Sequence, residues 1–436
     1  MKYFGTDGIR GKVHDFINFD LAYRVGQSLA SLNVPIVIIG KDTRESGTLL
    51  ADGIASGAKS VGINVCDIGI VSTPLLSYVS GRLQAIGVMI TASHNPYTDN
   101  GIKVFCLGKK LFSKQEQLLE DYLSGVVTVI ITNSGIDLAV VRAFDMYLDL
   151  FSPIMVKTSM KIVIDCANGS NYRIAPSIFS RITDKLIITG ANPNGQNINL
   201  DVGSTHLDNI INLIIKNEFD YGFAFDGDGD RLIVVDGNGR IFDGDMLIYI
   251  TAIYLKQHNA LKDSTVVLTK MSNLGIIKAF KMHGINPILT DVGDKFVLEA
   301  MENGDYTLGG ENSGHIINRT LLNTGDGALN AAYLVKIMEE TGMSLAELSK
   351  DVIMYPDKMV NLKNVNKQLL NHPDLVTLVD EWKLRLGDKG KILVRASGTE
   401  PLVRISVSAE SVEILEKCQN QIVDLLKRLN RQESHQ

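Results

Sequence analysis

One order of elements recurs three times along this chain, and it limits the possible folds more than any other feature. In each copy a short apolar, β-branched run enters a polar loop, and a helix-like stretch and a second apolar run follow. The first runs cover 34–44, 161–170 and 264–273, and the second runs cover 62–69, 185–190 and 284–293. Such alternation is typical of α/β proteins, so the sequence predicts three related α/β units.

Each unit then reaches a further apolar run that ends in an unusually polar loop. These loops read T-A-S-H-N-P at 91–96, D-G-D-G-D-R at 226–231 and G-E-N-S-G-H at 310–315. Any α/β protein produces some such parallels by chance, but the same order in all three units favours a repeat. Open α/β sheets bind ligands at the carboxyl ends of their strands, so these loops are the first candidates for a functional site.

The pattern changes around 354–368, and the rest of the chain indicates a smaller α+β unit. We expect a helix near 374–386, a strand pair around 395–407 and a closing helix from about residue 411. A chain of 436 residues is too long for one hydrophobic core. The predicted domains are 1–150, 151–248, 249–358 and 359–436.

The composition narrows the classes of partner. The 43 basic and 49 acidic residues give a formal charge of −6, which argues against non-specific binding to nucleic acid or to an anionic membrane. The four cysteines have no metal-like spacing. No apolar run approaches the roughly 18 residues that span a bilayer, and the glycine-rich, charged start is unlike a signal peptide. The expected location is the cytoplasm, and an anionic small molecule remains an acceptable substrate.

The loop D-G-D-G-D-R carries carboxylates at alternate positions, Asp226, Asp228 and Asp230. Carboxylates this close repel one another unless a cation lies among them, and hard oxygen ligands suit Mg²⁺ or Ca²⁺. An EF-hand does not fit, because Arg231 and Gly237 stand where it needs glycine and glutamate. A solvated acidic turn is the alternative. The apolar run at 221–225 argues against it, and three oxygens on one short loop favour Mg²⁺.

The stretch R-A-S-G-T-E-P-L-V-R at 395–404 has a composition that suits a phosphate group. Its candidate ligands are Arg395, Ser397, Gly398, Thr399 and Arg404. Main-chain N–H groups of a tight turn, with hydroxyls and two guanidinium groups, together bind a phosphate dianion. The stretch is not a P-loop, and no P-loop motif occurs elsewhere in the chain.

Two other loops carry candidate binding residues. In G-G-E-N-S-G-H, the side chains of Glu311 and Ser313 could hold sugar hydroxyls or an amine, and His315 is equally well interpreted as a structural histidine. Near the N-terminus, F-G-T-D-G-I-R-G places Arg10 after two glycines, where a phosphate contact is one interpretation.

Ser93 and His94 follow the apolar run 85–90 side by side, and three roles are open for the serine. It could be a hydrolase nucleophile with His94 as its base, a phosphate carrier or part of an ordinary turn. Adjacent side chains usually point in different directions, and no G-x-S-x-G elbow occurs, so a hydrolase is disfavoured. Lys103 lies ten residues further on and could serve as a cation beside a phosphorylated serine. Phosphoryl transfer therefore links these loops with the fewest assumptions.

In this order and spacing, T-A-S-H-N-P, D-G-D-G-D-R, G-G-E-N-S-G-H and R-A-S-G-T-E-P resemble the motifs of the α-D-phosphohexomutases. The resemblance runs from Phe4 to about Val407. The N-terminal motif and the third loop look most like those of the bacterial phosphoglucosamine mutases within this family. The resemblance implies three related α/β domains with mixed sheets and a smaller C-terminal α+β domain around a central cleft.

The resemblance also implies roles for individual residues. Ser93 would be the phosphoserine, whose phosphate oxygen completes a magnesium site with Asp226, Asp228 and Asp230. Sugar hydroxyls would be held by Glu311 and Ser313. The non-reacting phosphate would be bound by Arg395, Ser397, Gly398, Thr399 and Arg404. Cationic or proton-handling positions around the reacting group are matched by Arg10, Lys103, Arg231 and His315.

Two residues depart from the family pattern. Lys270 stands where an apolar residue is expected, and Lys295 stands where arginine is commoner. Lysine keeps the charge but loses the bidentate geometry of arginine, so a phosphate contact at either position is open.

The implied activity is the interconversion of glucosamine 6-phosphate and glucosamine 1-phosphate through a phosphoserine enzyme and glucosamine 1,6-bisphosphate. It would feed the synthesis of UDP-N-acetylglucosamine and of peptidoglycan precursors. The expected cofactor is Mg²⁺, the expected partner is a phosphosugar, and a homodimer is an open alternative to the monomer. Phosphomannomutase or phosphoglucomutase activity, a magnesium-dependent sugar phosphatase and a phosphosugar-binding regulator without activity are the competing hypotheses.

Overall fold

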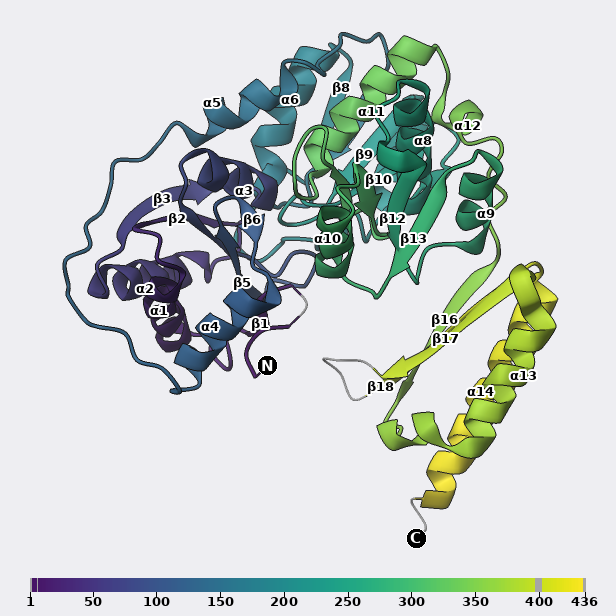
Figure 1. Cartoon of the computed structure of the whole chain (residues 1–436). Coiled ribbons are helices and arrows are strands. Elements are labelled where there is room, and N and C mark those ends of the chain that lie inside the picture. The colour runs from purple at the N-terminus through teal and green to yellow at the C-terminus, as the bar shows by residue number, and fades with distance from the viewer. Residues whose placement is uncertain (1, 6, 397–401, 434–436) are drawn as a thin grey trace. The chain divides into compact units, whose positions relative to one another are not determined.

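The computed structural model describes residues 2–5, 7–396 and 402–433. The chain divides into two compact units. One contains Met1–Met271 and Asn286–Ser349, and the other contains Ser272–Ile285 and Lys350–Gln436 (Figure 1). Among the helices of the described residues, none combines the length and the apolar character needed to cross a bilayer.

The first sheet has the strand order β1-β5-β4-β2-β3, with β6 paired to β5. Its elements are β1 (Ile9–Lys12), α1 (Phe19–Ser28), β2 (Ile36–Lys41), α2 (Gly47–Ser60), β3 (Asn64–Ile70), α3 (Thr73–Arg82), β4 (Ile86–Ile90), β5 (Asp99–Cys106), β6 (Lys109–Lys110) and α4 (Ser113–Leu123). β2, β3 and β4 are parallel, and β5 returns antiparallel to β4. Helices α1 and α2 cover one face and α3 the other (Figure 1), which explains why β4 is apolar and buried throughout.

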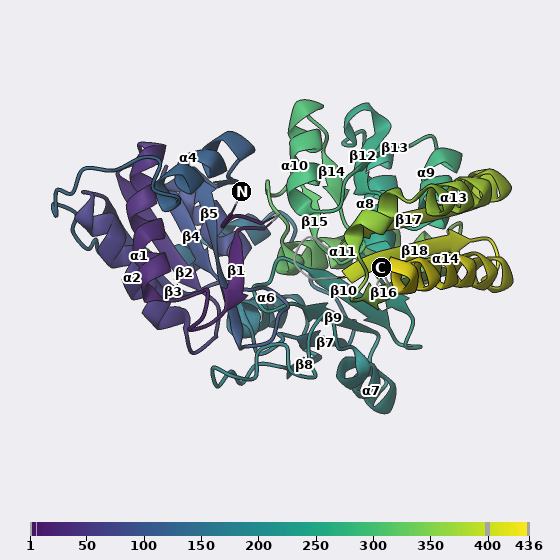
Figure 2. The same ribbon diagram turned by 90° about the horizontal axis from the view of Figure 1, so that it is seen from below.

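The second sheet has the order β11-β10-β9-β7-β8. Its elements are α5 (Ala143–Leu148), β7 (Ile162–Asp165), α6 (Ile174–Ile182), β8 (Leu186–Thr189), α7 (Asp208–Asn217), β9 (Tyr221–Phe225), β10 (Leu232–Asp236) and β11 (Ile241–Phe242). Helix α7 packs against β7 and β9 (Figure 2). Every residue of β9 and β10 is buried, so the turn between these strands begins and ends in the core.

The third sheet has the order β13-β12-β14-β15. The elements around it are α8 (Gly244–Gln257), β12 (Thr265–Thr269), β13 (Asn286–Thr290), α10 (Asp294–Asn303), β14 (Leu308–Gly310), β15 (Ile316–Asn318), α11 (Gly327–Thr341) and α12 (Leu345–Leu348). The side chain of Asp326 caps α11 by accepting a hydrogen bond from the main-chain N–H of Leu329.

The three sheets repeat one arrangement of strands. Their shared part reads β5-β4-β2-β3, β10-β9-β7-β8 and β15-β14-β12-β13, with three parallel strands and one antiparallel neighbour each time. The predicted repeat of α/β units is therefore confirmed. The polar loops follow β4, β9 and β14, which are equivalent strands.

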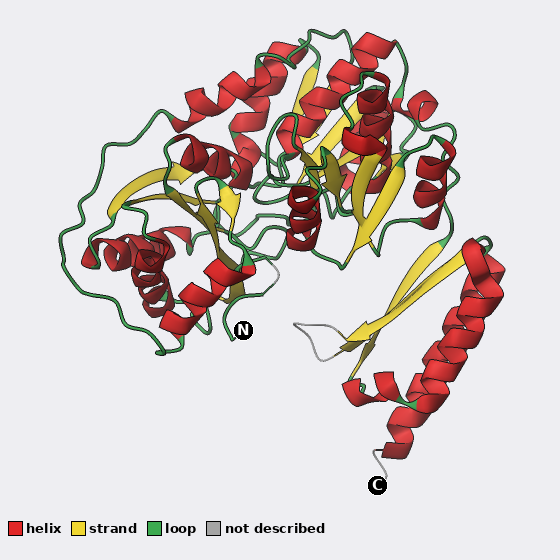
Figure 3. Ribbon diagram, viewed as in Figure 1, coloured by secondary structure: helices red, strands yellow, loops and turns green. Residues whose placement is uncertain are grey.

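The second compact unit is the predicted smaller α+β unit. Its elements are α9 (Leu274–Met282), β16 (Asp357–Lys363), α13 (Pro373–Leu386), β17 (Gly390–Ala396), β18 (Leu402–Ala409) and α14 (Val412–Glu433). The antiparallel sheet has the order β16-β18-β17, and α13 and α14 lie side by side against it (Figures 2 and 3). The helices expected near 374–386 and from about 411 are both present.

Candidate functional site

The loop after β4 holds Ser93 in a fixed and unusual conformation. Ser93 has φ +53°, in the left-handed region that non-glycine residues rarely adopt, and it is only 1% exposed. Its main-chain N–H donates to Oγ1 of Thr91 at 2.9 Å. Its hydroxyl donates to Oδ2 of Asp226 at 2.6 Å, so the loop after β4 meets the turn after β9.

His94 lies close to the serine hydroxyl, with Nδ1 at 3.3 Å from Oγ of Ser93. The expectation that these adjacent side chains diverge was wrong, since the two atoms lie within hydrogen-bonding distance. The serine hydrogen is nevertheless directed to Asp226, which leaves His94 no serine proton to accept. Burial, followed by the charges of Arg231 and Arg10, lowers the pKa of His94 to about 4, so this imidazole is neutral at pH 7.

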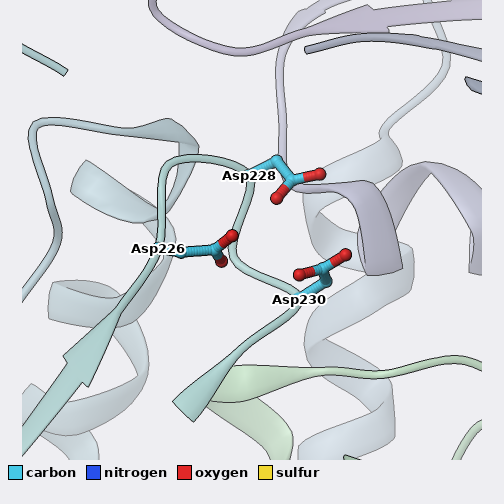
Figure 4. A group of neighbouring side chains, drawn as sticks. All are labelled: Asp226, Asp228 and Asp230. Atoms are coloured by element: carbon cyan, nitrogen blue, oxygen red, sulfur yellow. The ribbon is translucent and has the colours of Figure 1, made fainter. Parts of the chain in front are cut away.

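The turn between β9 and β10 brings the side chains of its three aspartates close together (Figure 4). Each offers an oxygen, and these atoms lie within 4.8 Å of one another. Gly229 has φ +76°, which lets the chain turn tightly enough for this convergence. Oδ1 of Asp228 and Oδ1 of Asp230 are buried and have no hydrogen-bond partner among the described residues. Hard, buried and unpaired oxygens fit a divalent cation such as Mg²⁺.

The carboxylates of the triad differ in their electrostatic surroundings. Burial, then the charges of Asp230 and Asp228, raise the pKa of Asp226 well above its usual range. Burial also acts to raise the pKa of Asp230, but Lys103 and His315 outweigh it and hold that pKa well below the usual range. A cation placed among the three would favour the ionised form of all of them.

Lys103, on β5, is the main positive charge beside the triad. Its Nζ lies 2.8 Å from Oδ2 of Asp228, 3.2 Å from Oδ2 of Asp230 and 3.0 Å from Oδ2 of Asp7. Burial would lower the pKa of Lys103, but these three carboxylates outweigh it and raise the pKa well above its usual value. Lys103 is thus a buried cation shared between the first and second sheets.

Sequence reasoning missed three further members of this charge network, Asp7, Lys110 and Asp294. Asp7 pairs with Arg10, with Lys103 and, at 2.7 Å, with Lys110. Lys110 also pairs with Asp294, whose Oδ2 lies 3.6 Å from Nε2 of His315. Asp7 lies inside the motif noted for Arg10 and Asp294 directly precedes Lys295, whereas Lys110 on the short strand β6 has no sequence signal at all.

The loop after β14 lies beside the same carboxylates. His315 is 3% exposed, and its Nδ1 is 3.5 Å from Oδ2 of Asp230. Its main chain pairs with Arg231 in an isolated β-bridge. Burial, then the charge of Asp294, raise the pKa of Glu311, whose Oε1 accepts a hydrogen bond from Gly293 N at 3.0 Å.

Ser313 adds a free hydroxyl to this loop, because its buried Oγ has no partner among the described residues.

Both lysines that depart from the family pattern are paired with carboxylates. Lys295 pairs with Glu116 of α4, and Nζ of Lys270 lies 2.6 Å from Oδ1 of Asp291 at the surface.

The arginines of the C-terminal motif face one another across a hairpin. Arg395 on β17 and Arg404 on β18 are direct cross-strand partners. Burial, then the charge of Arg404, lower the pKa of Arg395. Like charges directly opposite each other destabilise a strand pair, so the arrangement favours a bound anion. Ser397, Gly398 and Thr399 lie outside the described residues.

Comparison with protein families gives four matches that follow one another along the chain. The family models of the phosphoglucomutase/phosphomannomutase α/β/α domains I, II and III match residues 1–126, 145–239 and 243–355. The model of the C-terminal domain of the same family matches residues 358–425.

Curated relatives match over nearly the whole length. The phosphoglucosamine mutases of Leuconostoc mesenteroides and of an Exiguobacterium species are each 40% identical to the chain, and each comparison covers 98% of both proteins.

Solved structures of low sequence identity share the fold. A phosphoglucomutase/phosphomannomutase family protein from Burkholderia thailandensis has a TM-score of 0.81 at 22% identity and covers 97% of both chains. An Aspergillus fumigatus N-acetylphosphoglucosamine mutase, solved in complex with GlcNAc-6P and magnesium, has a TM-score of 0.65 at 17% identity and covers 98% of this chain and 96% of its own.

Proposed function

The chain belongs to the phosphoglucomutase/phosphomannomutase family of α-D-phosphohexomutases, and we propose that it interconverts glucosamine 6-phosphate and glucosamine 1-phosphate. The observation that carries this proposal is the 2.6 Å contact between the Ser93 hydroxyl and Asp226 of a buried carboxylate triad. A serine so placed can carry a phosphoryl group beside a metal. The 40% identity to phosphoglucosamine mutases over 98% of the chain supports the amino sugar as substrate.

Ser93 would be the carrier in both half-reactions. Phosphorylated Ser93 gives its phosphoryl group to the free hydroxyl of the sugar phosphate. The bond from phosphorus to Oγ breaks, a bond from phosphorus to the sugar oxygen forms, and the sugar proton passes to a base while Oγ regains a proton. The product is glucosamine 1,6-bisphosphate, which returns its other phosphoryl group to Ser93 after turning round in the site.

We assign Asp226, Asp228 and Asp230 as ligands of Mg²⁺, together with a phosphate oxygen on Ser93. When bound, Mg²⁺ would supply positive charge to the transferring phosphoryl group. Lys103 already lies against Asp228 and Asp230, so its positive charge would offset part of the negative charge of the carboxylates and of the phosphoserine.

The remaining residues of the site divide into proton carriers and binding groups. Lys103 and His315 both lie against Asp230 and are the two candidate general bases. The raised pKa of Lys103 favours its charged form, which cannot accept a proton, so it argues against Lys103 as the base. The pH–rate profiles of Lys103→Met and His315→Gln would separate these roles. Arg10 and Arg231 would contact the reacting phosphate, and Glu311 and Ser313 the sugar.

The non-reacting phosphate is assigned to Arg395, Ser397, Gly398, Thr399 and Arg404. These residues would bind whichever phosphate of the sugar is not reacting. One phosphoserine could then act on either end of the sugar, in both directions of the reaction. The cross-strand pairing of Arg395 with Arg404 supports this assignment, since an anion relieves the repulsion between them.

A coupled assay on glucosamine 6-phosphate, with and without a sugar bisphosphate primer, tests the proposal. Isomerisation that the primer accelerates is expected. Release of inorganic phosphate at the rate of substrate loss would identify a phosphatase instead, and binding without turnover would identify a regulator. The values of kcat/KM for glucosamine, glucose and mannose phosphates separate the proposed activity from that of a phosphoglucomutase or phosphomannomutase.

We also propose that the protein is cytoplasmic and that its product is used in the synthesis of UDP-N-acetylglucosamine. For its assembly we propose a homodimer. Support for the dimer comes from the segment between α4 and α5, which has several aliphatic side chains exposed, namely Val126, Val127, Ile130, Ile131, Ile136 and Val140. Exposed apolar groups in such number are common at protein–protein contacts. Light scattering on the purified protein gives the assembly directly, and a monomer mass would rule the dimer out.

A further inference from the structure

Arg44 lies behind the loop that carries Ser93 and binds that loop through its main chain. It follows β2 and is 3% exposed. Its Nη2 donates to the carbonyl oxygen of Ser93 at 3.0 Å and to that of Asn95 at 2.8 Å. Its Nη1 donates to the carbonyl oxygens of Pro96 and, at 2.9 Å, Asp99. One buried guanidinium therefore gathers four carbonyl groups between Ser93 and Asp99, the first residue of β5.

The remaining N–H of Arg44 is also used. Nε donates to Oδ2 of Asp42 at 2.9 Å, and the same Oδ2 accepts from the hydroxyl of Thr91 at 2.7 Å. Since guanidinium has five N–H donors, all of them are satisfied here. Thr91 in turn accepts the N–H of Ser93, so the arginine network reaches both sides of this residue.

Asn199, from the loop before α7, repeats two of these contacts from the second sheet's side. Its Nδ2 donates to the carbonyl oxygen of Ser93 at 2.9 Å and to that of Asn95 at 3.2 Å. The carbonyl oxygen of Ser93 also packs closely against Gly227. A Cβ atom at position 227 would lie only 2.5 Å from this oxygen, so the contact requires glycine. The serine main chain is thus held between Arg44, Asn199 and the turn that bears the aspartates.

We propose that Arg44 and Asn199 are positioning residues for phosphoryl transfer, which clamp the main chain of the Ser93 loop against the carboxylate turn. The inference rests on the proposed role of Ser93 as phosphoserine. Neither side chain contacts the serine hydroxyl. Together they keep Ser93 in its left-handed conformation, with Oγ directed at Asp226. A displacement of this loop of even about 1 Å would slow transfer by about hundredfold.

The experiment uses the full-length chain and the variants Asn199→Ala and Arg44→Lys. Gln196→Ala is the matched control, because Gln196 also bonds across the same boundary, at 2.8 Å to Oε2 of Glu45, but does not contact the loop. Each protein is incubated with a sugar bisphosphate, and intact mass gives the fraction of chains phosphorylated. Initial rates on glucosamine 6-phosphate are then divided by that fraction, which removes the effect of misfolded protein.

We expect Asn199→Ala to lower kcat per phosphorylated chain about tenfold, equivalent to about one hydrogen bond, with KM unchanged. Arg44→Lys keeps a positive charge beside Asp42 but loses the guanidinium group that binds several carbonyl oxygens at once. We expect kcat per phosphorylated chain to fall about hundredfold in this variant. Hydrogen exchange of the amides in 91–101 should quicken in both variants and not in the control.

A normal kcat per phosphorylated chain in Asn199→Ala would overturn the inference, whatever the change in melting temperature. If Arg44→Lys does not fold, Asn199→Ala still tests the inference. Asn199 is neutral, so its removal leaves no buried charge without a partner. Wild-type protein that takes up no phosphoryl group would refute the phosphoserine role itself, a result separate from either variant's.

Discussion

The hydroxyl of Ser93 lies 2.6 Å from Oδ2 of Asp226, which joins the ends of two equivalent strands, β4 and β9. A phosphoryl group on Oγ would enter the space that the aspartates surround. Nζ of Lys103 lies 2.8 Å from Oδ2 of Asp228 and would balance part of the negative charge that accumulates. The proposed phosphoryl relay would therefore depend on a contact between the first and second sheets rather than on any one motif.

Ser93→Ala tests the serine directly. Without Oγ there is no acceptor, so we expect turnover to fall by at least about 10³-fold, as when an enzyme loses its nucleophile. Intact mass after incubation with a sugar bisphosphate should show one added phosphoryl group on the wild type and none on the variant. Near-normal mutase activity in Ser93→Ala would exclude the mechanism.

Asp226→Asn separates metal binding from stability. Burial and the neighbouring carboxylates raise the pKa of Asp226, so its ionised form is costly in the metal-free protein. We expect the variant to melt at a higher temperature than the wild type in EDTA, because an amide carries no charge. Its oxygen can still accept from the main-chain N–H of Arg231, and its NH2 group can donate to Oγ of Ser93. In the wild type Mg²⁺ should raise the melting temperature with the logarithm of its concentration, and the variant should lose most of this gain. An equal response to Mg²⁺ in both proteins would remove Asp226 from the metal site.

The repeat and the polar loops could be predicted because they depend on local sequence. Strand β4, for example, is a continuous apolar run, and the loop that carries Ser93 begins where this run ends at Ile90. The direction of the Ser93 side chain could not be predicted, because φ +53° at a serine has no sequence signature.

The partners of the site were also beyond prediction where they come from distant parts of the chain. Lys110 pairs with Asp7 at a separation of 103 residues and with Asp294 at 184, and no local pattern specifies such pairs. Arg44 ends the first run, 34–44, but its acceptors are main-chain carbonyl groups, which every residue has.

Glu311→Gln tests the choice of sugar. If the Glu311 carboxylate binds the amine of glucosamine, the variant loses a charge-assisted hydrogen bond of about 1.5–3 kcal/mol, or about tenfold to hundredfold in kcat/KM. The loss should be larger for glucosamine 6-phosphate than for glucose 6-phosphate, which has no amine. Equal losses for both sugars would show that Glu311 binds a hydroxyl that the sugars share.

Asp326→Asn tests a buried carboxyl that links α5 to α11. Oδ2 of Asp326 accepts a 2.6 Å hydrogen bond from the hydroxyl of Tyr147, and Oδ1 caps α11. Burial raises the pKa of Asp326 from 3.8 to about 6, although both hydrogen bonds oppose the shift. Because the folded-state pKa is the higher one, the stabilisation that this group contributes is complete below about pH 4 and is lost as the pH rises through 6.

A shift of about two pKa units corresponds to about 3 kcal/mol of unfolding free energy. Asparagine remains a good helix cap and keeps a partner for Tyr147. The unfolding free energy of the variant minus that of the wild type should therefore rise between pH 4 and pH 7, as measured by urea denaturation in EDTA. A difference that stays constant over this range would mean that Asp326 ionises at its ordinary pKa, with Tyr147 and the cap offsetting the cost of burial.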